Sequence, residues 1–206
     1  MNRAFFKQPT LQLARALLGK RIVHEHANGL LSGRIVEVEA YMGPEDRAAH
    51  SYGGRRTTRT EVMYGPPGYA YIYLIYGMYH CFNVVSGPID KPEAILVRAV
   101  EPIEGLDLMI QHRFPQKAVQ GLTSRTLPHR LKRQLTNGPG KLCRAFDIDH
   151  RYYGHDLSQS PLMLEDDLNL LTRDIACGPR INIQYAEDAR DYPWRFWIKD
   201  HPFVSK

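Results

Sequence analysis

Hydrophobic and polar residues alternate along several stretches of the chain, as they do in half-buried β-strands. In the stretch VEVEAY, residues 36–41, the valines and the alanine point to one face, and Glu37, Glu39 and Tyr41 point to the other. A polar strand face normally lies in water, so two solvated glutamates are the simplest interpretation. The tyrosine on the same face favours a pocket wall instead, because a tyrosine ring tends to cover a neighbour or a ligand.

The same pattern predicts more strands than long helices. Strands are predicted at residues 21–26, 30–41, 69–85 (an aromatic-rich hairpin), 93–100, 179–184 and 194–199, and helices at 11–18, 103–113, 127–135 and 140–146. Asn28-Gly29 is a strong hairpin signal between the first two strands. We therefore expect a mixed α/β (α+β) fold with one domain, residues 1–206, on a curved, mostly antiparallel sheet with a protruding β-hairpin and peripheral helices.

The aromatic-rich hairpin places large side chains at its turn. Gly77 can adopt a positive φ, which puts Tyr76 and Met78 at or beside the tip. Tyrosines alternate along residues 69–73, so all three lie on one strand face, where cross-strand aromatic packing is the plain explanation. A stacking wall for a nucleic-acid base, with the tip as a wedge, is the functional alternative.

Two polar residues interrupt otherwise apolar strands. Arg98, in AILVRAV, is expected either to pair with an acid such as the nearby Glu101 or Glu104, or to face an anion in a cleft. Asn83 could read the edge of a base or only satisfy backbone groups. Both interpretations stay open for each residue.

Composition indicates an ordinary globular protein, with 43% apolar and 24% charged residues in 206. No apolar run approaches a membrane span, and the first twenty residues lack a secretory signal pattern, so we expect a cytoplasmic protein, nucleoid-associated if bacterial. The three cysteines lie far apart, and the histidines show no metal-ligand spacing. We expect no metal site and no cofactor.

Positive charge is concentrated in part of the chain. The net charge is +5, and residues 111–151 hold nine Lys or Arg against two Asp and no Glu. Arg55 lies in a second group of arginines, and Lys141 opens a predicted helix after the glycine-proline loop of NGPGKLCRAF. Such asymmetry indicates a polyanionic partner, and free N–H groups beside a lysine suit a phosphate.

Four stretches together resemble the alkyladenine (3-methyladenine) DNA glycosylase family. They are VEVEAYMGPEDRAAHSYGGRRTTRT, PPGYAYIYLIYGMYHCFNVV, AILVRAVEPIEG and TNGPGKLCRAF, in the order in which that family has them. They span about half the chain, and the last 26 residues before the C-terminal lysine are similar to a lesser degree. The resemblance implies a small, bacterial-type member of the family.

The resemblance also implies a role for each candidate residue. Glu39 is expected to activate water, and Arg98 to lie close to that water and the DNA backbone. The residues expected to hold the flipped base are Tyr41, His50, Tyr73 and Asn83. The residues expected to contact DNA outside the pocket are Tyr76, Met78, Lys141 and Arg55. Glu37 has no role in the family, and we expect Glu37→Gln to be nearly silent.

The implied function is DNA repair by a monofunctional glycosylase that removes alkylated or deaminated purines from duplex DNA. The expected substrates are 3-methyladenine and 7-methylguanine, with hypoxanthine and ethenoadenine as further candidates. The expected partner is double-stranded DNA containing damaged purines, with no membrane, and the expected state is a monomer. His80, where an apolar or aromatic residue is expected, could change base preference. The alternatives are a non-catalytic DNA-binding protein and a metal-independent nucleosidase.

Overall fold

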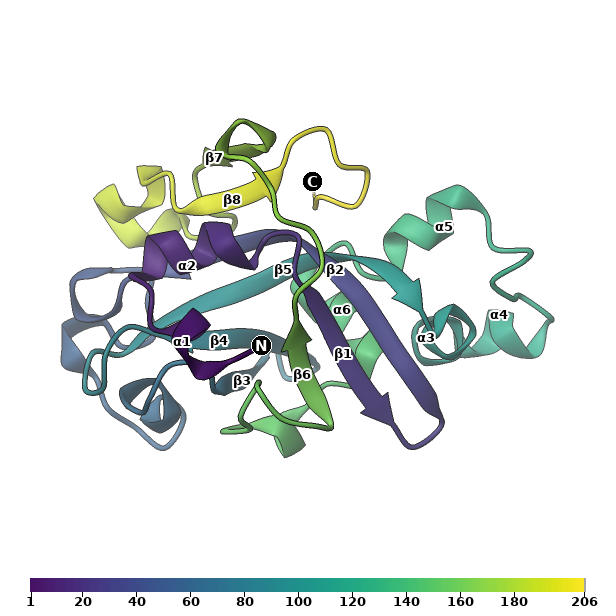
Figure 1. The fold of residues 1–206 in the computed structure, drawn as a ribbon, viewed down its shortest axis with the longest axis horizontal. Helices are drawn as coiled ribbons and strands as arrows, with labels where there is room; N and C mark the ends of the chain where they lie inside the picture. Colours follow the sequence, from purple (N-terminus) through teal and green to yellow (C-terminus); the bar gives the residue numbers. More distant parts are fainter. Residues whose placement is uncertain (206) are drawn as a thin grey trace.

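The computed structural model describes residues 1–205, in which short helices surround one β-sheet (Figure 1). The helices are α1 (Arg3–Phe6), α2 (Thr10–Leu17), α3 (Leu106–Arg113), α4 (Pro115–Val119), α5 (His129–Gln134) and α6 (Pro139–Phe146). The strands are β1 (Arg21–His26), β2 (Gly29–Tyr41), β3 (Ala70–Ile75), β4 (Tyr79–Ser86), β5 (Glu93–Glu104), β6 (Leu162–Glu165), β7 (Ile175–Gly178) and β8 (Arg195–Ile198). Short 3₁₀ segments lie between them, including η1 (Gly43–Glu45) and η6 (Gln184–Asp191).

All strand pairs are antiparallel, and the sheet runs in the order β3-β4-β5-β2-β1-β6. The central strand β2 is 13 residues long, so its two halves have different neighbours. β1 pairs with residues 29–34, and β8 pairs with residues 37–39 and carries β7 on its outer edge. This arrangement confirms the expected mixed α+β fold on a curved antiparallel sheet.

The main hydrophobic core lies between the sheet and the helices packed on it. Leu13 and Leu17 of α2 are fully buried, and their spacing of four places them on one helix face. Val38 and Ala40 of β2 belong to the same core, as predicted from the alternation. Val36, expected with them, packs instead in a separate small cluster, because the β2–β5 register shifts between residues 35 and 37.

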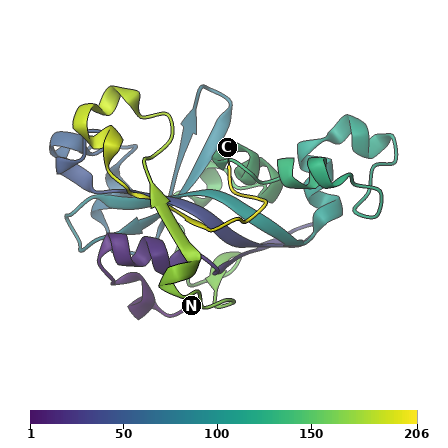
Figure 2. The same ribbon diagram turned by 90° about the horizontal axis from the view of Figure 1, so that it is seen from above.

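The β3–β4 hairpin protrudes as expected. Figure 2 shows it projecting on the side opposite α1 and α2, between the yellow-green segment containing η6 and the green and teal helices α3–α6. The N–H of Met78 donates to the carbonyl of Ile75 at 3.2 Å, and Tyr76 and Gly77 have φ of 53° and 68°. These are the features of a type I′ turn, which matches the twist of the flanking strands. Tyr76 and Met78 therefore occupy the tip.

Several predicted boundaries are wrong. The strand predicted at residues 179–184 is irregular chain leading into η6, whereas β6 and β7 were not predicted. The helix predicted from residue 103 begins at Leu106, since β5 continues to Glu104 by pairing with Ser32. The first hairpin turns at residues 27–28, one residue earlier than the expected Asn-Gly pair.

Within residues 1–205, every helix is too short or too polar to cross a lipid bilayer.

Candidate active site

A cavity of about 530 Å³ opens along one face of the β3–β4 hairpin. Its walls come from β2, β3, β4 and β5, from the start of α6 and from residues 181–185. Seven of the ten residues predicted for the site line it, namely Tyr41, His50, Tyr73, Tyr76, Asn83, Arg98 and Lys141. Cavities of this size hold small ligands, and a purine base is well within the range.

Glu39 lies beneath this cavity, with 0% of its surface exposed. Its Oε1 accepts a hydrogen bond from the backbone N–H of Ile181 at 2.7 Å, and its Oε2 accepts one from the Tyr41 hydroxyl at 2.9 Å. Arg98 Nη1 lies 3.3 Å from Oε2. Because Tyr41 and Arg98 both line the cavity, the carboxylate is in direct contact with two of its walls.

The surroundings of Glu39 have opposing effects on its charge. Burial raises the pKa of Glu39, and the charge of Arg98 is the largest of the effects that offset it. The hydrogen bonds from Ile181 and Tyr41 also lower the pKa, while the neighbouring Glu37 raises it. The net direction is upward, so Glu39 is a stronger base than an exposed glutamate.

The interpretation of two solvated glutamates is wrong, because Glu37 is also 0% exposed. β2 is a central strand that pairs with both β5 and β8, and the N–H groups of Ser205 and Ile181 bind the carboxylates of Glu37 and Glu39. Glu37 Oε1 accepts a hydrogen bond from Arg98 Nε at 3.2 Å. Arg98 therefore does pair with acids, but with Glu37 and Glu39 rather than with the sequence neighbours Glu101 and Glu104.

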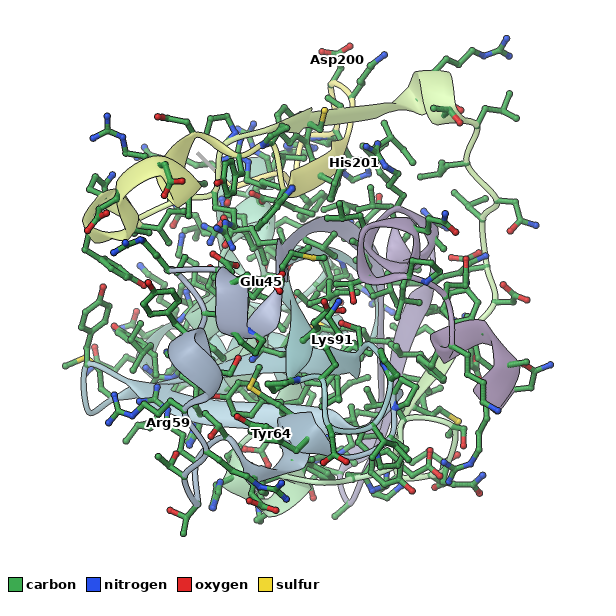
Figure 3. All side chains as sticks on the ribbon, turned by 90° about the vertical axis from the view of Figure 1, so that its left-hand side faces the viewer. Glu45, Arg59, Tyr64, Lys91, Asp200 and His201 are labelled. Carbon is green, nitrogen blue, oxygen red and sulfur yellow. The ribbon has the colours of Figure 1, made fainter. Side chains whose placement is uncertain are left out.

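Aromatic rings form the side of the cavity next to the hairpin. His50 Nδ1 is 2.8 Å from the hydroxyl of Tyr71, and the ring of His50 meets the ring of Tyr73 edge-on at 4.6 Å. Tyr69, which directly precedes β3, packs in one small cluster with Tyr71 and Tyr73. This confirms that the three tyrosines share a face. Arg59, labelled in Figure 3, places its guanidinium 4.8 Å from the ring of Tyr73.

His50 is expected to stay uncharged at neutral pH. Burial, the largest cause, acts with the positive charges of Arg59 and Arg55 to lower the pKa of His50 to about 4. An NMR titration of the imidazole should therefore show no transition between pH 5.5 and 8. A neutral ring has one nitrogen that donates a hydrogen bond and one that accepts. A midpoint near the ordinary value of about 6.5 would contradict this environment.

Asn83 lines the cavity, but its amide is committed to the backbone. Its Nδ2 donates to the carbonyl of Tyr71 at 2.9 Å and to that of Cys81 at 3.3 Å. Of the two roles left open for Asn83, bonding to backbone groups is therefore observed for Nδ2. Its Oδ1 accepts no hydrogen bond from residues 1–205. His80, on the same strand, pairs with Leu74 and does not line the cavity.

The remaining candidates lie at the rim or outside it. Tyr76 and Met78 are 75% and 66% exposed, which leaves two large apolar side chains in solvent at the hairpin tip. Lys141, in the first turn of α6, donates to Asn137 Oδ1 at 2.9 Å and lines the cavity. Arg55 is exposed and lies outside the cavity wall, close enough to His50 to affect its pKa.

Three further contributors were missed in the sequence. Arg180 is fully buried, forms an ion pair with Asp46, and places its guanidinium 4.7 Å from the ring of Tyr41, which it holds from behind. Tyr185, 69% exposed, and Ser205 both line the cavity. Residues 180–205, which hold all three, were predicted only as two strands and connecting chain. No local pattern there indicates contact with residues about 140 positions earlier in the sequence.

The described residues, 1–205, contain no group of three or more His, Cys, Asp or Glu side chains arranged to hold a metal ion. The chemistry available at the cavity is that of a buried carboxylate beside an arginine, enclosed by aromatic rings and bordered by cationic side chains.

Comparison with known proteins gives a consistent result. The family described as methylpurine-DNA glycosylase (MPG) matches residues 4–202. A relative from Bacillus mycoides (strain KBAB4), named "Putative 3-methyladenine DNA glycosylase", is 50% identical over 98% of this chain and 98% of its own. A relative of the same name from Bacillus cereus (strain G9842) is 49% identical over 98% of this chain and 97% of its own.

Proposed function

This chain belongs to the methylpurine-DNA glycosylase family and is a monofunctional DNA glycosylase for methylated purines, and we propose that it hydrolyses the N-glycosidic bond with a water activated by Glu39. The observation that carries the proposal is the buried carboxylate of Glu39 in contact with two walls of an aromatic cavity that is large enough for a base. The damaged purine leaves the DNA stack and enters this cavity, since its glycosidic bond is out of reach inside a duplex.

The contacts of Glu39 leave one acceptor site of its carboxylate unused. A carboxylate has about four acceptor sites, two on each oxygen. Among residues 1–205, Tyr41 and Arg98 contact Oε2, and Ile181 alone contacts Oε1. The free site on Oε1 is where we place the reacting water, which gives its proton to Glu39 as its oxygen attacks the sugar carbon. Until then the positive charge of Arg98 favours the ionised form of Glu39.

The flipped base stacks between Tyr41 and Tyr73, with His50 within hydrogen-bonding reach of its edge. Each tyrosine ring already has a guanidinium over it, Arg180 for Tyr41 and Arg59 for Tyr73, and neither arginine lines the cavity. A cation over one ring face weakens the attraction of the other face for a second cation. We therefore propose that stacking area contributes to base binding alongside cation–π attraction, so that neutral lesions such as hypoxanthine and ethenoadenine are accepted beside cationic 3-methyladenine and 7-methylguanine.

Tyr76 is the proposed wedge that fills the gap left by the base, with Met78 beside it. Its exposure at the end of a protruding hairpin supports this role, because a large side chain in water gains most from insertion between bases. Lys141 and Arg55 flank the cavity and are proposed to contact phosphates, which position the duplex without reading its sequence.

One assay separates this proposal from a nucleosidase and from a non-catalytic DNA-binding protein. The protein is incubated with duplex DNA carrying one methylated purine, and separately with the free methylated nucleoside, and released base and abasic sites are counted. We expect one abasic site for each base released from the duplex and slow or no release from the nucleoside. Release from the nucleoside alone, or binding of the duplex without release, would contradict the proposal.

Borohydride is expected to trap no covalent protein–DNA adduct, with or without a metal chelator present. A water mechanism forms no imine, and the amine of Lys141 is held by Asn137. Lys141 lines the cavity, which makes this a sharper test. An adduct that disappears in Lys141→Arg would contradict the water mechanism and identify Lys141 as the nucleophile.

A further inference from the structure

The chain that follows β8 folds back onto the cavity. Figure 3 labels Asp200 and His201 where this segment begins, at the end of the yellow strand. Phe203 anchors the segment, since it is 4% exposed and packs with Val36 and Ala99. This packing brings Ser205, 8% exposed, into the cavity wall.

Ser205 is bound to Glu37 by two hydrogen bonds. Its backbone N–H donates to Oε2 at 2.7 Å, and its hydroxyl donates to Oε1 at 2.9 Å. The hydroxyl also accepts a hydrogen bond from Arg98 Nη2 at 3.4 Å. In this buried setting, hydrogen bonds to charged groups are stronger than neutral ones, so the three residues form one unit.

This unit orients the guanidinium of Arg98. Nε is held by Glu37 and Nη2 by Ser205, and the remaining nitrogen, Nη1, faces Glu39 at 3.3 Å. A guanidinium is planar and rigid, so fixing two of its nitrogens fixes the third. The β2–β5 register also shifts beside Glu37, and Arg98 is the extra residue there, as in a β-bulge that re-aims a side chain.

We propose that Ser205 and Glu37 are positioning residues that hold Arg98 against Glu39 during base hydrolysis. This rests on the proposed function, in which Glu39 accepts a proton from water. A positive charge held close to Glu39 favours its ionised form, which is the form that accepts the proton. When Arg98 is loosened, Glu39 keeps its own proton to a higher pH, and less of the enzyme is active in acid.

Other groups also affect the charge of Glu39, and they must stay unchanged in the test. The titratable groups that act on Glu39 are Glu37 and Tyr41 on β2, Cys81 on β4, Arg98 on β5 and Tyr185 in η6. The N–H of Ile181 also binds Glu39, and Arg195 on β8 lies against Glu37. Ser205 carries no charge. Replacing it therefore leaves every one of these charges in place and changes only how Arg98 and Glu37 are held.

The test is the pH dependence of single-turnover base release from duplex DNA, using a lesion whose positive charge is fixed by alkylation. Ser205→Ala removes the hydroxyl, and Ser205→Pro removes both the hydroxyl and the N–H donor. Ser205→Thr keeps both donors, and Ser158→Ala is the matched control, since it removes a half-buried serine hydroxyl that is bonded to Asp156 outside the cavity lining. Thermal melting of each variant reports on folding.

In Ser205→Ala, we expect the acid limb of the profile to move to a pH about one unit higher. The rate of base release then falls roughly tenfold at acidic pH and returns to the wild-type rate at high pH. Ser205→Pro moves it further, whereas Ser205→Thr and Ser158→Ala retain the wild-type limb. An equal loss at every pH, or an unmoved limb in both Ala and Pro variants, overturns the positioning role. A wild-type protein that releases no base overturns the proposed function itself, and with it this inference.

Discussion

Glu39→Gln is expected to lower the single-turnover rate of base excision by about 10²–10⁴-fold while duplex DNA still binds. General-base catalysis is typically worth this much, and glutamine has no basic oxygen of comparable strength. DNA affinity depends mainly on phosphate contacts outside the cavity, so it should change little. The measurements are a single-turnover time course and a binding titration on the same one-lesion duplex.

Glutamine also disturbs the local hydrogen bonds. One oxygen of Glu39 accepts a hydrogen bond from Ile181, and the other faces the donors of Tyr41 and Arg98. In either orientation of the glutamine amide, its NH₂ group therefore faces another hydrogen-bond donor. A mismatch of this kind costs about 1–3 kcal/mol of stability, so melting curves must accompany the rates.

The matched control is Glu45→Gln, an exposed glutamate in η1 that Figure 3 labels. Glu37→Gln cannot serve as that control, because Glu37 is buried and holds Arg98. We expect Glu37→Gln to reduce activity, contrary to the expectation from sequence. Excision by Glu39→Gln within a few-fold of the wild type would mean that another group activates the water.

Tyr76→Ser is expected to slow excision by about tenfold or more on a well-paired lesion. Extruding a paired base costs a few kcal/mol, part of which the wedge offsets. Without the wedge, each 1.4 kcal/mol that is no longer offset lowers the excision rate about tenfold. The lesion opposite a mismatched partner is already partly unpaired, so the defect should be smaller there. Single-turnover rates on the two duplexes, which differ only in the opposing base, measure the difference.

Lys141→Ala is the contrasting variant. Its loss should be nearly the same on both duplexes, and the salt dependence of binding should become shallower because one phosphate contact is lost. Tyr76→Ser should leave that salt dependence unchanged. Equal defects of Tyr76→Ser on paired and mispaired lesions would rule out insertion and leave Tyr76 as an ordinary turn residue.

Local sequence patterns predicted most of the fold near the cavity. The alternation in β2 placed Glu39 and Tyr41 on one face, and Gly77 located the hairpin tip. Such features depend on neighbouring residues, so they can be read in a single stretch of sequence. The family resemblance then singled out the candidate residues, and the structure brings Glu39, Tyr41 and Arg98 into contact.

Features that depend on distant segments were not predicted. The solvation of Glu37 was misjudged, since β8 and Ser205, which bury it, lie about 160 residues further along the chain. The acids considered as partners of Arg98 were its neighbours in sequence, although strand pairing with β2 decides its partners. Arg180 lies in a segment that was predicted as a strand, and a buried ion pair with Asp46 holds its side chain. Partner choice of this kind is a tertiary property.

The most direct measurement of the central claim is the pH profile of single-turnover excision for the wild type and Glu39→Gln on one duplex, with a lesion of fixed charge. The deprotonated fraction of a base grows with pH, so the wild-type rate should rise through one ionisation and then level off. Because burial raises the pKa of Glu39, that ionisation should lie above the ordinary glutamate value of about 4.3. In Glu39→Gln the rate should be about 10²–10⁴-fold lower and the rise should be absent. The same rise in both proteins would show that Glu39 is not the group that activates water.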